Sequence, residues 1–197
     1  MTTAFSKDEK VFIEEKLHEV ARKCLFKYGV QKTTVAQITK MAGISKGSFY
    51  SFYPSKEMLF FVILEEYQKN MMNGLVDHLK KEDYIDVEKF TRLLYNAYKN
   101  IRYSFVMTIL QNQEIELLMR KLPKDIITHH HSFDETVIEE ILSHVKLKKG
   151  ISADLFSASL RAIFMSMLHT EAIGEKQFDE VLEVLINGLA QQIIEEA

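Results

Sequence analysis

Residues 34–56 constrain the fold more than any other stretch, because they combine short helical patterns with signals that end them. Thr34 stands where a helix can begin, and Gln37 follows three positions later, which is the arrangement of a capping box. Apolar residues then recur on one face of the expected helix. Gly43 comes where the chain must turn, and glycine allows a turn at little steric cost. The pattern predicts a short helix closed by a tight turn.

A second short helix is predicted directly after this turn. Ser45 can cap it, and its first turn carries Lys46, Gly47 and Ser48. Pro54 cannot continue the helix, because its ring removes a backbone donor and clashes with the preceding turn. A short helix that begins with small and cationic residues, and that another helix braces, is suited to entering the major groove of DNA. The two helices together form a helix-turn-helix pattern.

The charge distribution agrees with a nucleic-acid contact at this end of the chain. Residues 1–60 hold ten Lys and Arg against six Asp and Glu, a net charge of +4. Residues 61–197 hold fifteen against twenty-two, a net charge of −7, and the two sums give the −3 of the whole chain. The overall pI of about 6.2 does not suggest a polyanion binder. Only the surface that faces DNA needs to be positive, so the asymmetry is the informative quantity.

A specific order of motifs surrounds the helix-turn-helix. It consists of an amphipathic first helix ending in F-x-K-Y-G-V, then T-T-V-A-Q-I-T-K-M-A-G-I-S-K-G-S-F-Y-S-F-Y, then P-S-K-E-M-L. Over about residues 10–65 the chain resembles the DNA-binding domain of the tetracycline-repressor (TetR) family of bacterial transcriptional regulators. The resemblance implies an all-α protein in which a three-helix DNA-binding domain, residues 1–53, is joined by a continuous helix to a helical ligand-binding and dimerisation domain, residues 54–197.

The expected DNA contacts begin with the first turn of the second short helix. Lys46 can reach a guanine or a phosphate, Ser48 can donate or accept a hydrogen bond, and Gly47 lets the backbone approach the duplex. The resemblance implies phosphate contacts from Tyr50 and Lys56, from the hydroxyls of Thr33 and Thr34, and from the amides at the start of the first short helix. The expected DNA-binding residues are Thr33, Thr34, Ser45, Lys46, Gly47, Ser48, Tyr50, Ser51 and Lys56. By the same resemblance Phe49 packs in the core.

The rest of the chain also favours helices, since it contains only two prolines and seven glycines. Ser6 can cap a first helix over residues 7–27, and Ser55 a long one that reaches at most Lys80. Further helical patterns are expected over 87–122 (with a break near 103–108), over 133–146, and in the two apolar segments 155–168 and 178–193, with Ser152 as a cap.

The last two helical segments have wide apolar faces, which suits a four-helix bundle formed by two subunits. In the resembled family such a bundle is the homodimer interface. The expected interface residues are Leu160, Phe164, Met167, Val181, Leu185, Leu189 and Ile193. A monomer that buries the same faces as ordinary core is the alternative.

The region from about Tyr67 to Lys149 is rich in Met, Phe, Tyr and Leu. In the resembled family this region encloses a pocket for a small effector, and an apolar or amphipathic ligand is expected here. The candidate pocket residues are Phe90, Leu94, Tyr98, Phe105, Leu110, Phe133 and Phe164, with Gln111, Asn112, Glu114 and His169 as polar contacts. The alternative for each apolar residue is plain core. Whether the ligand releases DNA or promotes its binding stays open.

Several other functions lack the motifs they need. The sequence holds no Gly-rich phosphate loop, nucleophile elbow or zinc-ligand spacing, so we expect neither an enzyme nor a cofactor or metal site. Three consecutive histidines, 129–131, cannot converge on one ion from a helix. Cys24 is expected in the core, and no signal peptide or membrane span is visible, so the chain is expected in the cytoplasm. The other hypothesis is an all-α binding protein or enzyme that keeps the helix-turn-helix shape without a DNA role.

Overall fold

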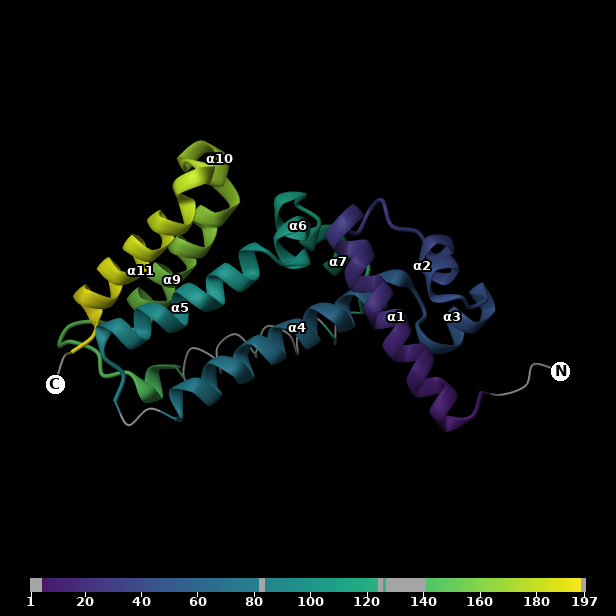
Figure 1. The fold of residues 1–197 in the computed structure, drawn as a ribbon, viewed down its shortest axis with the longest axis horizontal. Helices are drawn as coiled ribbons and strands as arrows, with labels where there is room; N and C mark the ends of the chain where they lie inside the picture. The colour runs from purple at the N-terminus through teal and green to yellow at the C-terminus, as the bar shows by residue number, and fades with distance from the viewer. Residues whose placement is uncertain (1–4, 82–83, 124–125, 127–140, 196–197) are drawn as a thin grey trace. The chain divides into compact units, whose positions relative to one another are not determined.

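The structure is a computed structural model that describes residues 5–81, 84–123, 126 and 141–195. It confirms the all-α fold class. The helices are α1 (Lys7–Tyr28), α2 (Val35–Ala42), α3 (Lys46–Phe52), α4 (Lys56–Leu79), α5 (Val87–Arg102), α6 (Phe105–Gln111), α7 (Ile115–Met119), α9 (Ala153–Ser166), η1 (Met167–His169), α10 (Thr170–Ile173), η2 (Glu175–Gln177) and α11 (Phe178–Ile193) (Figure 1).

Two compact units divide the chain, and α4 begins in one and ends in the other. Unit 1 comprises residues 1–67 and 104–124, and unit 2 comprises 68–103 and 125–197. The expected functional boundary after residue 53 is therefore not where the compact units divide. The first half of α4 belongs to the same unit as the helix-turn-helix. Helices α6 and α7 belong to it too, although α4 and α5 separate them from the helix-turn-helix in the sequence.

Unit 1 is built around α1, whose boundaries follow from local signals. Ser6 and Glu9 form the predicted capping box, and the chain leaves the helix at Gly29. The buried face of α1 includes Leu17, Cys24 and Leu25, so the prediction that Cys24 is a core residue is confirmed. Helices α2 and α3 lie together against this part of the unit (Figure 1).

Local capping also sets the two short helices. Thr34 and Gln37 form a complete capping box at the start of α2, and Gly43 ends it in the left-handed conformation, with φ 71° and ψ 31°. Only glycine adopts that conformation routinely, which explains why the turn stands at this residue. Ser45 caps α3 by accepting from the Ser48 amide at 3.0 Å. The predicted helix-turn-helix is thus present with the predicted caps.

Unit 2 packs α5, α9 and α11 side by side (Figure 1). The rings of Phe90 on α5 and Phe156 on α9 lie 6.0 Å apart, and both side chains are buried. The Tyr98 hydroxyl donates to the Leu160 carbonyl at 3.0 Å, and burial raises the pKa of Tyr98 well above its usual value. These contacts fasten α9 onto α5.

The predicted interruptions between helices are partly confirmed. The expected break near residues 103–108 lies at Tyr103 and Ser104, between α5 and α6. A further turn at residues 112–114 was not predicted, and within it Gln113 takes a positive φ of 56°. Of the helix expected over 133–146, the structure describes residues 141–146, of which 141–144 are helical. Phe133 and the histidines 129–131 lie outside the described residues.

Two features that other functions would need are missing from the described residues. No helix in this part of the chain is long and apolar enough to cross a membrane. No group of three or more His, Cys, Asp or Glu side chains is arranged there to hold a metal ion.

Candidate nucleic-acid interface

Helix α3 is held on unit 1 by two aromatic side chains. Phe49 is fully buried, as predicted, and Tyr53 is buried just after the helix ends. The Tyr53 hydroxyl lies 2.5 Å from His18 Nε2 and donates to Glu14 Oε1 at 3.1 Å, so the end of α3 is tied to α1. Burial, together with the negative charge of Glu14, raises the pKa of Tyr53 well above its usual value.

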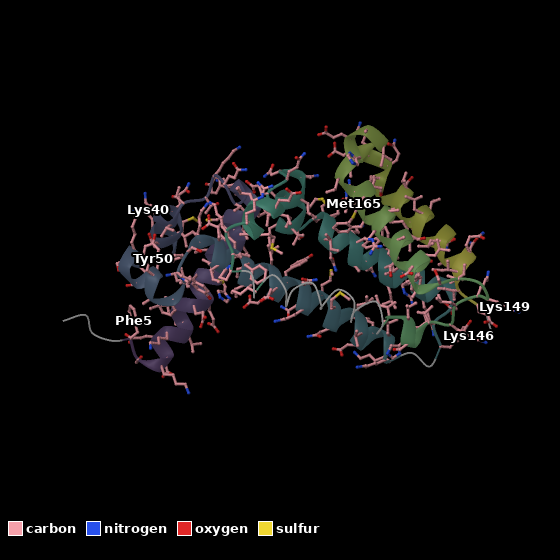
Figure 2. The ribbon with its side chains drawn as sticks, turned by 180° about the vertical axis from the view of Figure 1, so that it is seen from behind. Phe5, Lys40, Tyr50, Lys146, Lys149 and Met165 are labelled. Carbon is pink, nitrogen blue, oxygen red and sulfur yellow. The ribbon has the colours of Figure 1, made fainter. Side chains whose placement is uncertain are left out.

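The opposite face of α3 is open to solvent and carries the predicted recognition residues. Lys46, Gly47 and Ser51 are exposed, and Ser48 is half-buried. Tyr50 is 56% exposed, and its ring stands edge-on to the buried Phe49. Figure 2 shows Tyr50 and Lys40 on the surface formed by α3 and α2. The exposed face is therefore polar and cationic, and it is the first turn of α3 that presents the lysine.

The serines at positions 45, 48 and 51 are already hydrogen-bonded around α3. The hydroxyls of Ser45 and Ser48 lie 2.9 Å apart, and the Ser51 hydroxyl donates to the Ser48 carbonyl at 2.6 Å. A hydroxyl bonded in this way keeps lone pairs that can still accept from a base edge. Lys46 is the long, exposed donor of the first turn.

Gly47 provides a test of close backbone approach. A Cβ built at this position would meet only Ser45 Oγ at 3.7 Å, which is ordinary contact. Gly47→Ala should therefore fold normally and raise the free energy of unfolding by up to about 1 kcal/mol, because alanine favours helices. The same methyl group should weaken duplex binding by about tenfold, since it occupies the gap between backbone and bases. Thermal unfolding and fluorescence anisotropy with labelled duplex measure the two effects. Unchanged DNA affinity would show that α3 does not approach the duplex through this residue.

The structure corrects the role expected for Thr33. Its side chain is 1% exposed, and its hydroxyl donates to the Gly29 carbonyl at 2.7 Å. A buried hydroxyl that is already bonded cannot grip a phosphate, so Thr33 acts inside the loop before α2. Thr34 is exposed, but its hydroxyl belongs to the capping box of α2. The first amides of α2 follow directly after this cap, and helix-start amides lack intrahelical acceptors.

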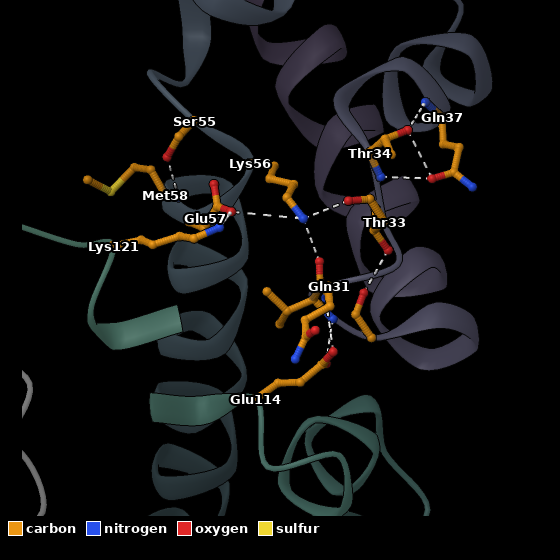
Figure 3. Close-up of polar contacts among 12 residues, drawn as sticks. Gln31, Thr33, Thr34, Gln37, Ser55, Lys56, Glu57, Met58, Glu114 and Lys121 are labelled. Carbon is orange, nitrogen blue, oxygen red and sulfur yellow. Dashed lines mark hydrogen bonds and ion pairs between the residues drawn. The ribbon is translucent and has the colours of Figure 1, made fainter. Parts of the chain in front are cut away.

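Lys56 also differs from expectation, because its ammonium is engaged within the protein. Nζ donates to the Val30 carbonyl at 2.5 Å and to the Thr33 carbonyl at 2.6 Å (Figure 3). Burial lowers the pKa of Lys56, and the negative charge of Glu57 partly offsets that effect. We expected the Lys56 ammonium to bind a phosphate directly. In the structure it binds two backbone carbonyls instead.

Glu57 completes this end of α4. It is buried, lies 3.9 Å from the Lys56 ammonium, and accepts a hydrogen bond from Lys121 at 2.8 Å. Burial alone would raise the pKa of Glu57, but the hydrogen bond from Lys121 and the two positive charges hold it below its usual value. The carboxylate is therefore ionised at neutral pH and balances both lysines.

Glu114 was expected to line an effector pocket, and the structure places it elsewhere. Its side chain is 3% exposed, and its two carboxylate oxygens accept from consecutive backbone amides, Val30 at 2.6 Å and Gln31 at 2.9 Å. Figure 3 shows Glu114 reaching this loop from the turn after α6. A carboxylate whose two oxygens are used in this way fastens the loop before α2, and it is not free to contact an effector.

Comparison with known proteins decides the family. The family model described as "Bacterial regulatory proteins, tetR family" matches residues 17–63. The transcriptional regulator QacR of Staphylococcus aureus is 24% identical over 192 residues, which cover 91% of this chain and 99% of QacR. The chain belongs to the tetR family. It is a transcriptional regulator, and because its relatives are regulators, the prediction that it is not an enzyme is confirmed.

Solved structures of low sequence identity share the fold of this tetR-family chain. FadR from Bacillus subtilis, solved with stearoyl-CoA, has a TM-score of 0.66 at 14% identity and covers 90% of this chain and 95% of its own. A regulator from Saccharomonospora viridis, solved with choline, has a TM-score of 0.64 at 16% identity and covers 93% and 98%. These two structures support the fold.

Close contact between Glu114 and Gly29 explains another feature of the tetR-family chain. Gly29 has φ 72° and ψ −169°, a conformation that is essentially restricted to glycine. A Cβ there would collide with Glu114 Oε2. Gly29→Ala should therefore lower the free energy of unfolding by at least about 1–3 kcal/mol from backbone strain alone. Chemical denaturation measures this effect, with Gly74→Ala as the control because a Cβ meets nothing within 4 Å there. An unfolding midpoint equal to that of the control would contradict the backbone conformation and the contact assigned to Gly29.

The predicted effector residues of this regulator divide between the two compact units. Buried on α5 in unit 2 are Phe90, Leu94 and Tyr98, and Phe164 on α9 places its ring 6.4 Å from that of Tyr98. His169 is exposed in η1. The remaining described candidates belong to unit 1, and they are Phe105, Leu110, Gln111, Asn112 and Glu114. Phe105 is buried there, with its ring 5.3 Å from that of Tyr67.

The predicted dimer residues need a similar correction. Leu160, Met167 and Ile193 are buried within unit 2, so they are core residues of the subunit. Leu185 is 40% exposed, and Phe164, Val181 and Leu189 are half-buried. Other exposed apolar residues on the same two helices were not predicted, and they are Leu155, Met165 and Val184. For Val184 the signal is an apolar stripe on α11, offset from the buried one, that contains Val181, Val184 and Leu185.

Proposed function

We propose that this chain is a dimeric repressor that binds a palindromic operator and is released by a small apolar or amphipathic effector. The observation that carries the proposal is the exposed first turn of α3, where Lys46, Gly47 and Ser48 stand above the buried Phe49. A rigid short helix with a cation and small residues at its start can place donors against base edges in the major groove. Ser51 and Tyr50, one turn further, extend this contact.

Phosphate contacts flank the recognition helix in this proposal. Tyr50 is exposed next to the base-reading turn, and the first amides of α2 lie just after the capping residue Thr34. Helix N-termini attract phosphate because their amides lack intrahelical acceptors. Lys40, exposed in the last turn of α2, adds positive charge on the same surface (Figure 2).

Dimer formation is proposed through α9 and α11. Regulators of the tetR family bind operators and act as dimers. Leu155 and Met165 on α9 and Val184 and Leu185 on α11 expose apolar surface that a second copy would cover. One short recognition helix reaches few bases, whereas two helices about 34–36 Å apart read both halves of a palindrome.

The effector is proposed to bind unit 2. Its core is rich in aromatic side chains, with Tyr98 and Phe164 near each other and Phe90 beside Phe156. Apolar walls with one or two polar groups favour an apolar or amphipathic molecule. A ligand that favours a dimer whose two recognition helices are wrongly spaced weakens DNA binding. By reciprocity, bound DNA weakens ligand binding by the same factor.

The salt dependence of duplex binding tests this function. Anisotropy of a labelled duplex of mixed sequence should report binding at about 50 mM salt that weakens steeply by about 200 mM, because each neutralised phosphate releases counterions. Stearoyl-CoA should release the bound protein, and choline serves as the polar comparison. Absence of binding to any duplex at low salt would contradict the proposal and favour a helical binding protein without a DNA role.

A further inference from the structure

The loop between α1 and α2 is held on both sides by charged side chains from distant parts of the chain. The Val30 carbonyl accepts a hydrogen bond from Lys56 Nζ at 2.5 Å, and the Val30 amide donates one to Glu114 Oε2 at 2.6 Å. Lys56 also binds the Thr33 carbonyl, and Glu114 also binds the Gln31 amide. Two side chains thus make four hydrogen bonds to the backbone of one short loop, residues 29–33 (Figure 3).

These contacts are built into unit 1. Glu114 is buried, and a carboxylate in such a place needs hydrogen-bond donors to offset its lost hydration. The backbone before Glu114 is unusual, because Gln113 has a positive φ of 56°. The Glu114 amide donates to the Ile109 carbonyl at 2.9 Å, and this turn directs the carboxylate toward the loop. Gly29 leaves room for the carboxylate, since a Cβ would collide with it. Backbone strain at such a residue is retained where the surroundings enforce it.

The loop leads directly into the N-terminus of α2. Thr33 donates to the Gly29 carbonyl across the loop, and Thr34 caps the helix. Residues 29–33 therefore set where the first amides of α2 stand relative to α3. A displacement of about 1 Å is enough to break a hydrogen bond from an amide to a phosphate.

We propose that Glu114 and Lys56 are positioning residues for DNA binding, which hold residues 29–33 so that the N-terminus of α2 meets a phosphate. Neither side chain touches DNA in this arrangement. The inference rests on the proposed function, and it replaces a direct phosphate contact from Lys56 by an indirect one. It also gives Glu114 a role in the DNA-binding unit instead of in a ligand pocket.

The test compares Glu114→Gln, Lys56→Met and the double variant with the unmodified dimer. The glutamine of Glu114→Gln has one carbonyl oxygen to accept from two backbone amides. The methionine of Lys56→Met has nearly the length of lysine but no hydrogen-bond donor. Glu116→Gln and Lys69→Met are matched controls, because both parent residues are exposed and lie in helices α7 and α4 instead of in the loop. Each protein is titrated against labelled specific and mixed-sequence duplexes at several salt concentrations, and its active fraction is measured by stoichiometric titration.

Both single variants should bind both duplexes about tenfold more weakly, with the ratio between the two affinities unchanged. The salt slope should fall by about 0.9 for each phosphate that the protein no longer neutralises. The double variant should be little weaker than either single one, because both changes release the same loop. The controls should match the unmodified protein.

Three results would overturn the inference. Unchanged affinity and salt slope in Glu114→Gln would show that the loop position is not needed. A reduced active fraction with unchanged affinity and slope would show a purely structural role. Weaker binding in Lys56→Met alone would show a direct phosphate contact. Failure of the unmodified protein to bind any duplex would instead overturn the proposed function, before any variant is compared.

Hydrogen exchange of the unmodified protein provides a measurement that does not depend on a variant folding. The peptide covering residues 30–33 should exchange slowly, because the Val30 and Gln31 amides are bonded to Glu114. Gln31 is an exposed residue, so its amide would otherwise exchange as quickly as that of a free loop. Rapid exchange of both amides would contradict the proposed positioning.

Discussion

Replacing Val184 by glutamate is expected to give a folded monomer whose affinity for the operator is at least about 100-fold lower than that of the parent protein. Val184 is 70% exposed on α11, so a charged side chain there has little cost within one subunit. In a symmetric dimer the same change places two carboxylates in an apolar interface. Loss of the second reading head removes a factor of about 10²–10⁴ in apparent affinity, because the two half-sites are no longer bound together.

Analytical ultracentrifugation and anisotropy measure the two consequences of this change. Lys149→Glu is the control, because Lys149 is exposed in the loop before α9 and lies outside the proposed interface (Figure 2). A Val184→Glu protein that remains a dimer would exclude α11 from the interface. A monomer with parental operator affinity would contradict the need for two reading heads.

Lys46→Ala is expected to weaken operator binding by about 1–3 kcal/mol and to relax sequence preference at one position in each half-site. The reason is that Lys46 stands in the first exposed turn of α3, where a lysine can reach the O6 and N7 atoms of guanine. The variant should fold normally, because the parent side chain is exposed. Competition binding with duplexes changed at single positions measures the preference.

Lys40→Ala provides the comparison for that experiment. Lys40 is exposed in the last turn of α2, outside the recognition turn. Its removal should weaken binding to all duplexes about equally if it only adds positive charge near the phosphates. An equal effect on all duplexes for Lys46→Ala would reduce Lys46 to a phosphate contact.

Local signals explain why the helix-turn-helix could be predicted from the sequence. The caps at Ser6, Thr34 and Ser45 depend on residues within three positions of each other, and Gly43 ends α2 through its own backbone freedom. Such signals act regardless of the rest of the chain. They placed the first three helices and the exposed face of α3 correctly.

Long-range packing explains what could not be predicted. Glu114 and Val30 are 84 residues apart, and no local pattern indicates that a carboxylate after α6 will meet the loop before α2. The same holds for Lys56, which has the sequence position of a phosphate contact but binds backbone carbonyls.

Three predicted dimer residues, Leu160, Met167 and Ile193, lie in the subunit core instead, for a related reason. On α9 and α11 apolar residues extend beyond the buried face, as the exposed Leu155, Met165 and Val184 show, so hydrophobic spacing alone does not tell the subunit core from an outer face. Packing within unit 2 buries Leu160 and leaves Val184 outside. Only the packed subunit distinguishes these two stripes.

Selection of bound fragments from random duplex DNA tests the central claim most directly. The account predicts enrichment of a sequence with two-fold symmetry, whose half-sites are separated by about one helical turn or a small multiple of it. Under the proposed function, adding a small apolar or amphipathic effector should release the selected fragments. Recovery of fragments without any shared sequence, or of a single unsymmetrical half-site bound by a monomer, would contradict the account.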